Sequence, residues 1–185
     1  MAIVFRFFYL GPDINILLKM RQLQVVVIGD AQADNAELAF ASKLGQYLGK
    51  KGYTVITGGR SGIMEAVSKG AFEAGGITVG IVPGADFKQA NPWCSVVIPT
   101  NMGHARNSIT ALSADVIISI GGKAGTLTEL GFGWIYNKPI ISVSQFGGWS
   151  ARLSGRKIDD RRSDNIIDVD SFESLKEALE NIVNV

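Results

Sequence analysis

The sequence predicts an α/β fold in which a doubly wound parallel sheet lies inside a single three-layer α/β/α domain. Continuous apolar runs rich in β-branched residues alternate along the chain with segments of helical periodicity, as in parallel sheets covered on both faces. Glycine is frequent, with 22 of 185 residues, and only 19% of the residues are charged. This composition fits buried strands joined by tight turns.

Seven apolar runs are predicted to form the strands, and a glycine or proline ends or follows most of them. The strands are expected at Leu23–Gly29, Tyr53–Thr57, Ile77–Val82, Ser95–Ile98, Asp115–Ile120, Pro139–Val143 and Asn165–Val169.

Helices are expected between these strands. The first follows Asp34-Asn35-Ala36-Glu37, which has the pattern of a capping box, and ends near Lys51. The others are expected from Ile63 to about Gly75, at Met102–Ser113, at Thr126–Tyr136, and after a second capping box at Asp170-Ser171-Phe172-Glu173. Residues 145–164 are predicted to form a long loop. Strands and helices in this order indicate a Rossmann-like fold over residues 20–185.

Residues 1–19 form an apolar extension before this domain. The run contains Arg6 and stops at Gly11-Pro12, so it is too short to span a bilayer, and it lacks the features of a signal peptide. We expect its apolar side chains to pack on the domain or across a subunit interface. The alternative is that Met20 is the natural start and the extension is dispensable.

Charge and cysteine content exclude several classes of function. The net charge of +1 gives no field that would attract nucleic acid or a membrane surface. The single cysteine, Cys94, allows no internal disulfide, which fits a cytoplasmic protein. With His104 as the only histidine, we expect no metal site.

Three strand-to-helix turns contain glycine and are the expected ligand site, because ligands of such sheets bind at the carboxyl ends of the strands. They are Gly29-Asp30-Ala31, Gly58-Gly59-Arg60-Ser61-Gly62 and Gly121-Gly122-Lys123-Ala124-Gly125-Thr126. The first turn lacks the G-x-G-x-x-G pattern of dinucleotide sites, and the third is not a Walker A loop because Ala124 follows Lys123. Glycines leave the main-chain N–H groups of these turns uncovered, the turns lead into helix N-termini, and two of them carry Arg60 or Lys123. Together these features favour binding of a phosphate. The alternative is that these turns only connect elements.

The stretch from Asn101 to Glu129 resembles the Lonely Guy family, the cytokinin-activating phosphoribohydrolases long mislabelled as lysine decarboxylases. That family shows M-x-x-R-K and, further along, P-G-G-x-G-T-x-x-E. Arg106 falls on the family arginine, and the loop motif is matched by Gly122, Gly125, Thr126 and Glu129. An earlier G-G-x-x-G-x-M turn is matched by Gly58, Gly59, Gly62 and Met64. The resemblance covers about residues 22–143.

Three positions depart from the family pattern. Asn107 replaces lysine, Gly121 replaces proline, and Lys123 replaces the second loop glycine. These changes look more like a neighbouring branch that includes the molybdenum cofactor carrier proteins. The resemblance implies a homodimer or homotetramer that holds a small phosphate-bearing molecule. Lysine decarboxylation is rejected, because no lysine has the surroundings that a pyridoxal cofactor needs.

The sequence therefore predicts binding of a phosphate-bearing, nucleotide-like ligand, with no cofactor required. The bound molecule would be a nucleoside monophosphate or a molybdopterin-type ligand. The alternatives are a nucleoside 5′-monophosphate phosphoribohydrolase, with Arg106 and Glu129 as catalytic residues, and a molybdenum cofactor carrier. The expected ligand-binding residues are Gly29, Asp30, Gly58, Gly59, Arg60, Ser61, Gly62, Arg106, Asn107, Gly121, Gly122, Lys123, Ala124, Gly125 and Thr126.

Structural alternatives exist for several of these residues. Thr126 and Glu129 form T-x-x-E, which would also serve as a capping box. Arg106 near a helix N-terminus opposes the helix dipole, so an anionic neighbour is favoured over a plain surface position. Phe87 and Trp93 either cover a base or pack at the surface. Asp30 and Asp34 are expected either to contact a ligand or to cap the first helix, and capping is favoured for Asp34. Met64 is expected in the core, and His104 is expected to be a loop residue rather than a catalyst.

Overall fold

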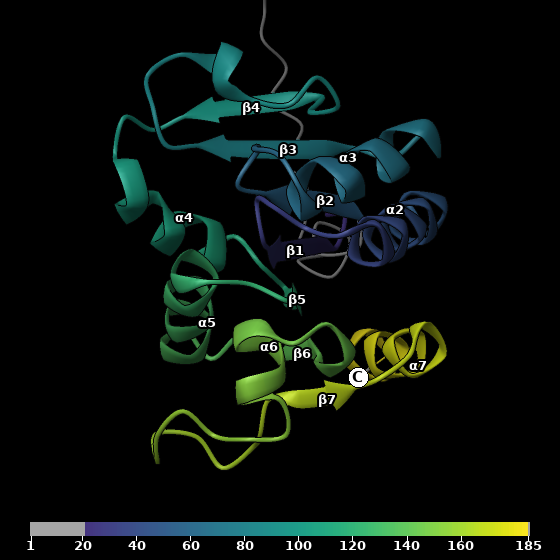
Figure 1. Ribbon diagram of the computed structural model, residues 1–185, viewed down its shortest axis with the longest axis vertical. Helices are drawn as coiled ribbons and strands as arrows, with labels where there is room; N and C mark the ends of the chain where they lie inside the picture. Colours follow the sequence, from purple (N-terminus) through teal and green to yellow (C-terminus); the bar gives the residue numbers. More distant parts are fainter. Residues whose placement is uncertain (1–20, 185) are drawn as a thin grey trace, which may run out of the picture.

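The computed structural model describes residues 21–184. Its centre is a sheet of seven parallel strands in the order β4-β3-β2-β1-β5-β6-β7 (Figure 1). The strands are β1 (Gln24–Gly29), β2 (Thr54–Thr57), β3 (Thr78–Val82), β4 (Val96–Pro99), β5 (Val116–Ile120), β6 (Ile140–Val143) and β7 (Ile167–Val169). All seven predicted strands are confirmed within one or two residues at each end. The expected packing of residues 1–19 and the role of Met20 lie outside the described residues.

The strand order reverses between β1 and β5. From β1 the chain adds β2, β3 and β4 outward on one side, then crosses over to β5 and adds β6 and β7 on the other. β1 pairs with both β2 and β5, with Gly29 beside Ile120 at the carboxyl end. In doubly wound sheets this reversal opens the crevice in which ligands bind. The predicted fold class is therefore confirmed, and its switch point lies between two of the glycine-containing turns.

Helices cover both faces of the sheet, which gives three layers (Figure 1). The helices α2 (Asn35–Lys50), α3 (Ile63–Glu73) and α7 (Phe172–Val183) pack on one face, and α4 (Arg106–Leu112), α5 (Ala124–Ile135) and α6 (Gly148–Leu153) on the other. Alternate residues of β1 serve the two cores: Val25 and Val27 face α2 and α3, whereas Val26 and Ile28 face α4 and α5.

The helix ends confirm one predicted cap and correct another. Asp34 caps α2 through a full capping box, in which Glu37 N–H donates to Asp34 Oδ1 at 2.9 Å and Asp34 N–H donates to Glu37 Oε2 at 2.8 Å. The second predicted box is wrong by one residue. Ser171 is the N-cap of α7 and pairs with Ser174, because Ser171 has the extended backbone of a cap.

Three helix boundaries differ from the prediction. The segment Met102–Ser113 begins with a 3-10 turn, Gly103–Ala105, so α4 starts only at Arg106. α5 starts at Ala124, two residues before the predicted Thr126. The predicted loop 145–164 contains α6 and a 3-10 turn that starts at Ser144. Within residues 21–184, no helix has both the length and the hydropathy to cross a membrane.

Candidate functional site

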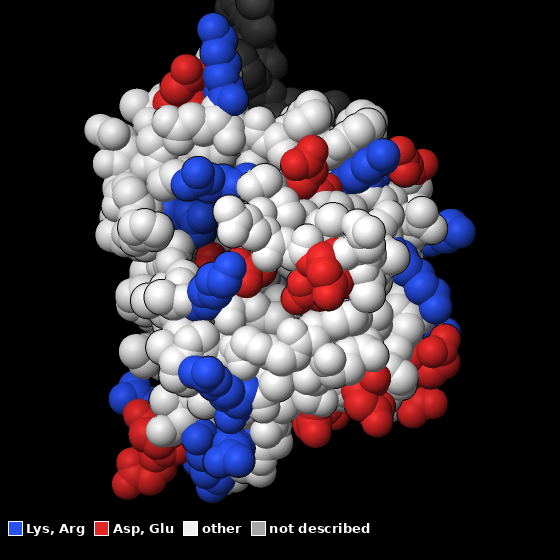
Figure 2. All heavy atoms as spheres, in the orientation of Figure 1, with Lys and Arg blue, Asp and Glu red and all other residues white. Residues whose placement is uncertain are grey.

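A pocket of about 240 Å³ lies at the carboxyl ends of β1 and β5, where the strand order reverses. Figure 2 shows basic side chains flanking recessed acidic ones on this face of the molecule. The lining residues come from the turns after β1, β2 and β5 and from the segment that opens α4: Gly29, Asp30, Ala31, Arg60, Met64, His104, Arg106, Asn107, Lys123, Gly125, Thr126 and Glu129.

A buried ion pair between Arg106 and Glu129 forms the floor of this pocket. Arg106 Nη1 donates to Glu129 Oε1 at 2.9 Å, and each side chain is only 9% exposed. The same Nη1 donates to Asn107 Oδ1 at 2.6 Å, while Asn107 Nδ2 donates to Thr128 Oγ1 at 2.7 Å. The pair is thus fixed from α4 and α5 together, so the surface-position alternative for Arg106 is excluded.

The turn after β2 makes room for this arginine. A Cβ on Gly58 would lie 2.3 Å from Arg106 Nη2, so a larger residue would displace the guanidinium. Arg106 Nη2 reaches the carbonyl oxygen of Gly58 at 3.5 Å, and Arg106 Nε is buried without a hydrogen-bond partner among the described residues. Arg106 therefore joins the β2–α3 turn to the α5 side of the pocket.

Burial controls the charge of Glu129. Desolvation raises the pKa of its carboxyl group to about 7, although the charge and hydrogen bond of Arg106 act in the lowering direction. A carboxyl group with this pKa exchanges its proton near neutral pH. Glu129 is therefore suited both to accept a hydrogen bond and to move a proton.

The start of α5 presents its main-chain N–H groups at the pocket. Lys123 is the N-cap, and its side chain makes no capping bond. Thr126 is the third residue of the helix, so the proposed capping box between Thr126 and Glu129 is wrong, and Glu129 pairs with Arg106 instead. The N–H groups of Ala124, Gly125 and Thr126 have no partner inside the helix. Gly125 is exposed and open, which leaves this end of α5 accessible.

The first half of the same turn is buried and held by α6. Ser150 donates to the Gly121 carbonyl oxygen from its main-chain N–H at 3.0 Å and from its hydroxyl at 2.7 Å. Trp149 N–H donates to the Gly122 carbonyl oxygen at 3.0 Å. These bonds fix the direction in which α5 begins.

Two basic side chains stand at the mouth of the pocket. Arg60 comes from the β2–α3 turn and Lys123 from the β5–α5 turn, and both are exposed. Lys123 Nζ lies 3.4 Å from Asp30 Oδ2. The Lys123 side chain is 68% exposed although Asp30 is only 18% exposed, so water weakens the contact from the lysine side and Lys123 stays accessible to a ligand.

The structure gathers nine of the predicted site residues in the pocket and leaves seven outside its lining. Those in the lining are Gly29, Asp30, Arg60, Arg106, Asn107, Lys123, Gly125, Thr126 and Glu129. Gly58, Gly59, Ser61, Gly62, Gly121, Gly122 and Ala124 belong to the same turns and shape them from behind or beside the pocket.

Three lining residues were not among the predicted ligand-binding or catalytic residues. Ala31 extends the first turn, and His104, expected to be only a loop residue, lines the pocket from the 3-10 turn before α4. Met64 is 8% exposed and is both core and lining. The available signals were the place of His104 two residues before Arg106 and the G-G-x-x-G-x-M match of Met64. Trp93 packs edge-on against Phe72 at 5.9 Å, so the surface-packing alternative describes it.

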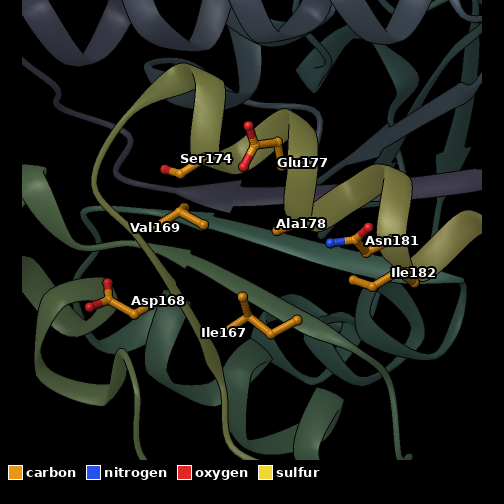
Figure 3. Close-up of a pocket in the computed structure, with 8 residues that line it drawn as sticks. All are labelled: Ile167, Asp168, Val169, Ser174, Glu177, Ala178, Asn181 and Ile182. Atoms are coloured by element: carbon orange, nitrogen blue, oxygen red, sulfur yellow. The ribbon is translucent and has the colours of Figure 1, made fainter.

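A larger cavity, of about 460 Å³, lies beside β7 and α7, away from the glycine turns (Figure 3). Its described lining includes Asp168 and Glu177 and no lysine or arginine, and Asp168 Oδ1 accepts a hydrogen bond from Ser154 Oγ at 2.6 Å. With acidic side chains and no cation in its described lining, this cavity is electrostatically unsuited to the phosphate that the sequence predicts.

Comparison with known proteins places these features in a family. The sequence matches the SLOG cluster4 family over residues 22–176. It is 31% identical over 144 residues to the cytokinin riboside 5′-monophosphate phosphoribohydrolase of Mycobacterium tuberculosis, covering 71% of this chain and 77% of that protein.

Two solved structures are similar over nearly their whole length. The molybdenum cofactor binding protein of the phototrophic bacterium Rippkaea orientalis superposes with a TM-score of 0.79 and 32% identity, covering 89% of this chain and 99% of that one. The molybdenum cofactor carrier protein of Chlamydomonas reinhardtii gives 0.74 and 26%, with the same coverage of 89% and 99%. The chain therefore belongs to the SLOG cluster4 family of Lonely Guy-like Rossmann proteins, in the branch nearest the molybdenum cofactor carrier proteins.

Proposed function

We propose that the protein binds a phosphate-bearing, nucleotide-like ligand, with the phosphate at the start of α5 between Arg60 and Lys123. One observation carries this proposal: two cationic side chains and the open N–H end of α5 meet in one pocket at the switch point of the sheet. A helix N-terminus presents N–H donors and partial positive charge, and both cations add to the attraction for an oxyanion.

The pocket volume suggests which part of the ligand enters. At about 240 Å³ the pocket is smaller than the roughly 300–1,000 Å³ typical of sites for whole drug-sized ligands. It suits a phosphoribosyl-sized group, with a sugar hydroxyl as donor to the Glu129 carboxylate that Arg106 holds in place. A molybdopterin-type ligand is the alternative occupant, because the relatives from Rippkaea orientalis and Chlamydomonas reinhardtii are named for the molybdenum cofactor.

The binding proposal is tested by calorimetric titration with ribose 5-phosphate. Arg60→Ala is expected to weaken binding about tenfold or more, because a hydrogen bond to a charged group contributes about 1.5–3 kcal/mol. Arg152→Ala is the matched control: Arg152 is an exposed cation that stacks on Trp149 at 5.0 Å and does not line the pocket. Absence of binding to the wild-type protein at millimolar ribose 5-phosphate contradicts the proposal.

Native mass spectrometry of the same sample checks the expected homodimer or homotetramer.

Hydrolysis of a nucleoside 5′-monophosphate is the second candidate, favoured by the pKa of about 7 at Glu129. Water would attack the anomeric carbon while the N-glycosidic bond breaks, so that the base leaves with a proton and ribose 5-phosphate remains. Glu129 would take the proton from the water, and Arg106 would keep the carboxyl group in position. The mycobacterial relative carries the name of such an activity.

Glu129→Gln separates the two functions. The amide keeps the size of the side chain but cannot move a proton, so release of base from a nucleoside 5′-monophosphate that the wild-type protein cleaves is expected to fall by about 10²–10⁴-fold. Affinity for ribose 5-phosphate should change only a few-fold. Glu73→Gln, at the far end of α3, is the control. If the wild-type protein releases no base from any common monophosphate, the hydrolytic function is wrong and the binding function stands.

A further inference from the structure

A second cavity adjoins the candidate site, and the two share Arg60. It measures about 280 Å³ and lies between the start of α3 and the loop after β3. Its lining consists of Arg60, Ser61, Glu65, Gln89, Ala90, Asn91 and Pro92. The first pocket alone holds only part of a nucleotide, whereas the two cavities together reach the size range of typical ligand sites.

The wall of this second cavity is fixed to the β2–α3 turn through Asn91. Its main-chain N–H donates to the Gly59 carbonyl oxygen at 2.7 Å, and its Nδ2 donates to the Arg60 carbonyl oxygen at 3.0 Å. Its Oδ1 accepts from Trp93 N–H at 3.1 Å. Asn91 therefore links the loop after β3 to the β2–α3 turn at the wall of the cavity.

The chemical character of the cavity is set by Glu65. This half-buried residue lies in the first turn of α3, and none of the ion pairs between described residues includes it. Lys69 lies one helical turn further on. Its Nζ is 3.9 Å from Glu73 and 5.2 Å from the centre of the Trp93 ring, and the contact with Glu73 is weak because both side chains are about half exposed. Glu65 also lines a neighbouring cavity of about 560 Å³ together with Lys69, so it stands between two cavities, and a ligand in the 280 Å³ cavity can reach its carboxylate.

A carboxylate in this cavity disfavours a second phosphate and favours a group with adjacent N–H donors. It repels a second phosphate, although Arg60 is close by. Its two oxygens accept two parallel hydrogen bonds when a ligand offers two adjacent N–H donors. A ring N–H next to an exocyclic amino group supplies this pair, as on guanine or a pterin. Adenine lacks it, because its ring nitrogen beside the amino group is an acceptor.

We propose that this cavity binds the heterocycle of the ligand and that Glu65 selects a ring with adjacent N–H and amino donors, of the guanine or pterin type. The proposal rests on the proposed function, because the phosphate must lie in the neighbouring pocket. Arg60, which lines both cavities, would lie between the phosphate and the ring. The ligand would then extend from the start of α5 across the β2–α3 turn.

Calorimetric titration of the full chain with four probes tests this. Ribose 5-phosphate reports the phosphate site alone, and inosine 5′-monophosphate has the ring N–H without the amino group. Guanosine 5′-monophosphate and neopterin monophosphate carry the complete edge on a purine and on a pterin. At least one of these two is expected to bind about tenfold more tightly than inosine 5′-monophosphate, the effect of one charge-assisted hydrogen bond.

Variants at Glu65 complete the test. Glu65→Gln should abolish this preference and leave affinity for ribose 5-phosphate unchanged, whereas Glu73→Gln on the same helix should keep the preference. The proposal is overturned if both complete-edge ligands bind no more tightly than inosine 5′-monophosphate, or if Glu65→Gln retains the preference. Failure of the phosphate site itself would appear differently, as absence of ribose 5-phosphate binding.

Discussion

Replacing Arg106 with alanine is expected to lower the free energy of unfolding by about 3–5 kcal/mol at pH 8, the cost typical of removing one partner of a buried ion pair. The reason is that Glu129 would keep its buried position and lose its counter-charge at 2.9 Å. Arg60→Ala is the matched control. It removes an exposed cation from the same pocket, so it should change stability by less than about 0.5 kcal/mol.

The loss in Arg106→Ala should shrink at pH 6. The folded-state pKa of Glu129 is about 7, above its ordinary 4.5, so the stability it contributes is present at low pH and is lost as pH rises through about 7. Arg106 acts to lower that pKa, so removing it moves the pKa higher still. At pH 6 the carboxyl group is then mostly neutral in both proteins. Urea unfolding at pH 6 and pH 8 measures the difference, and an equal loss at both values contradicts a role for Glu129 ionisation.

A double variant separates stability from binding. In Arg106→Met with Glu129→Leu, both charges are replaced by apolar side chains, which is often neutral or stabilising for a buried pair. This variant should recover most of the stability lost in Arg106→Ala and should still bind ribose 5-phosphate less tightly than the wild type. Recovery of both properties would show that the pair has no part in binding.

Gly62→Ala is expected to be the most damaging exchange in the β2–α3 turn. Gly62 has a φ of 69°, and a Cβ there would lie 2.2 Å from the Asp30 carbonyl oxygen, which accepts from Ile63 N–H. The turns after β1 and β2 would have to separate, and both line the pocket. The melting temperature in thermal unfolding and the affinity for ribose 5-phosphate should therefore both fall.

Gly52→Ala isolates the cause. Gly52 has a similar φ of 73°, but a Cβ there would meet nothing within 4 Å. Gly52→Ala should lower the free energy of unfolding only by the backbone strain, about 1–2 kcal/mol. The clash in Gly62→Ala should add a further 1–3 kcal/mol, roughly the penalty of overpacking. Equal stability of the two variants would mean that the contact between the turns is not needed.

The sheet could be predicted from the sequence because each buried parallel strand is a continuous apolar run, and local patterns suffice to locate it. The cap at Asp34 was predictable for the same reason, since both partners lie within four residues. The resemblance placed Arg106 and Glu129 in one site, but their direct ion pair was not predicted. It joins residues 23 positions apart and depends on how α4 packs against α5.

Neither the start of α5 nor the presence of α6 was predicted, because glycines lie in the first turn of each helix. Gly125 lies in the first turn of α5, although glycine is a poor helix former, so the sequence suggested a later start. α6 is only six residues long and follows Gly147, and its place depends on bonds from Trp149 and Ser150 to the β5–α5 turn. Such short helices are stabilised by tertiary contacts rather than by their own periodicity.

The central proposal is that an anion binds at the start of α5, and amide chemical shifts during a phosphate titration test it most directly. The N–H groups of Ala124, Gly125 and Thr126 should shift in a saturable way at millimolar phosphate, together with the Arg60 side chain, whereas the amides of α7 should not move. Ribose 5-phosphate should shift the same amides at lower concentration, because its sugar adds contacts near Glu129. If the amides of residues 124–126 respond to neither compound at millimolar concentration, no phosphate site exists at this turn.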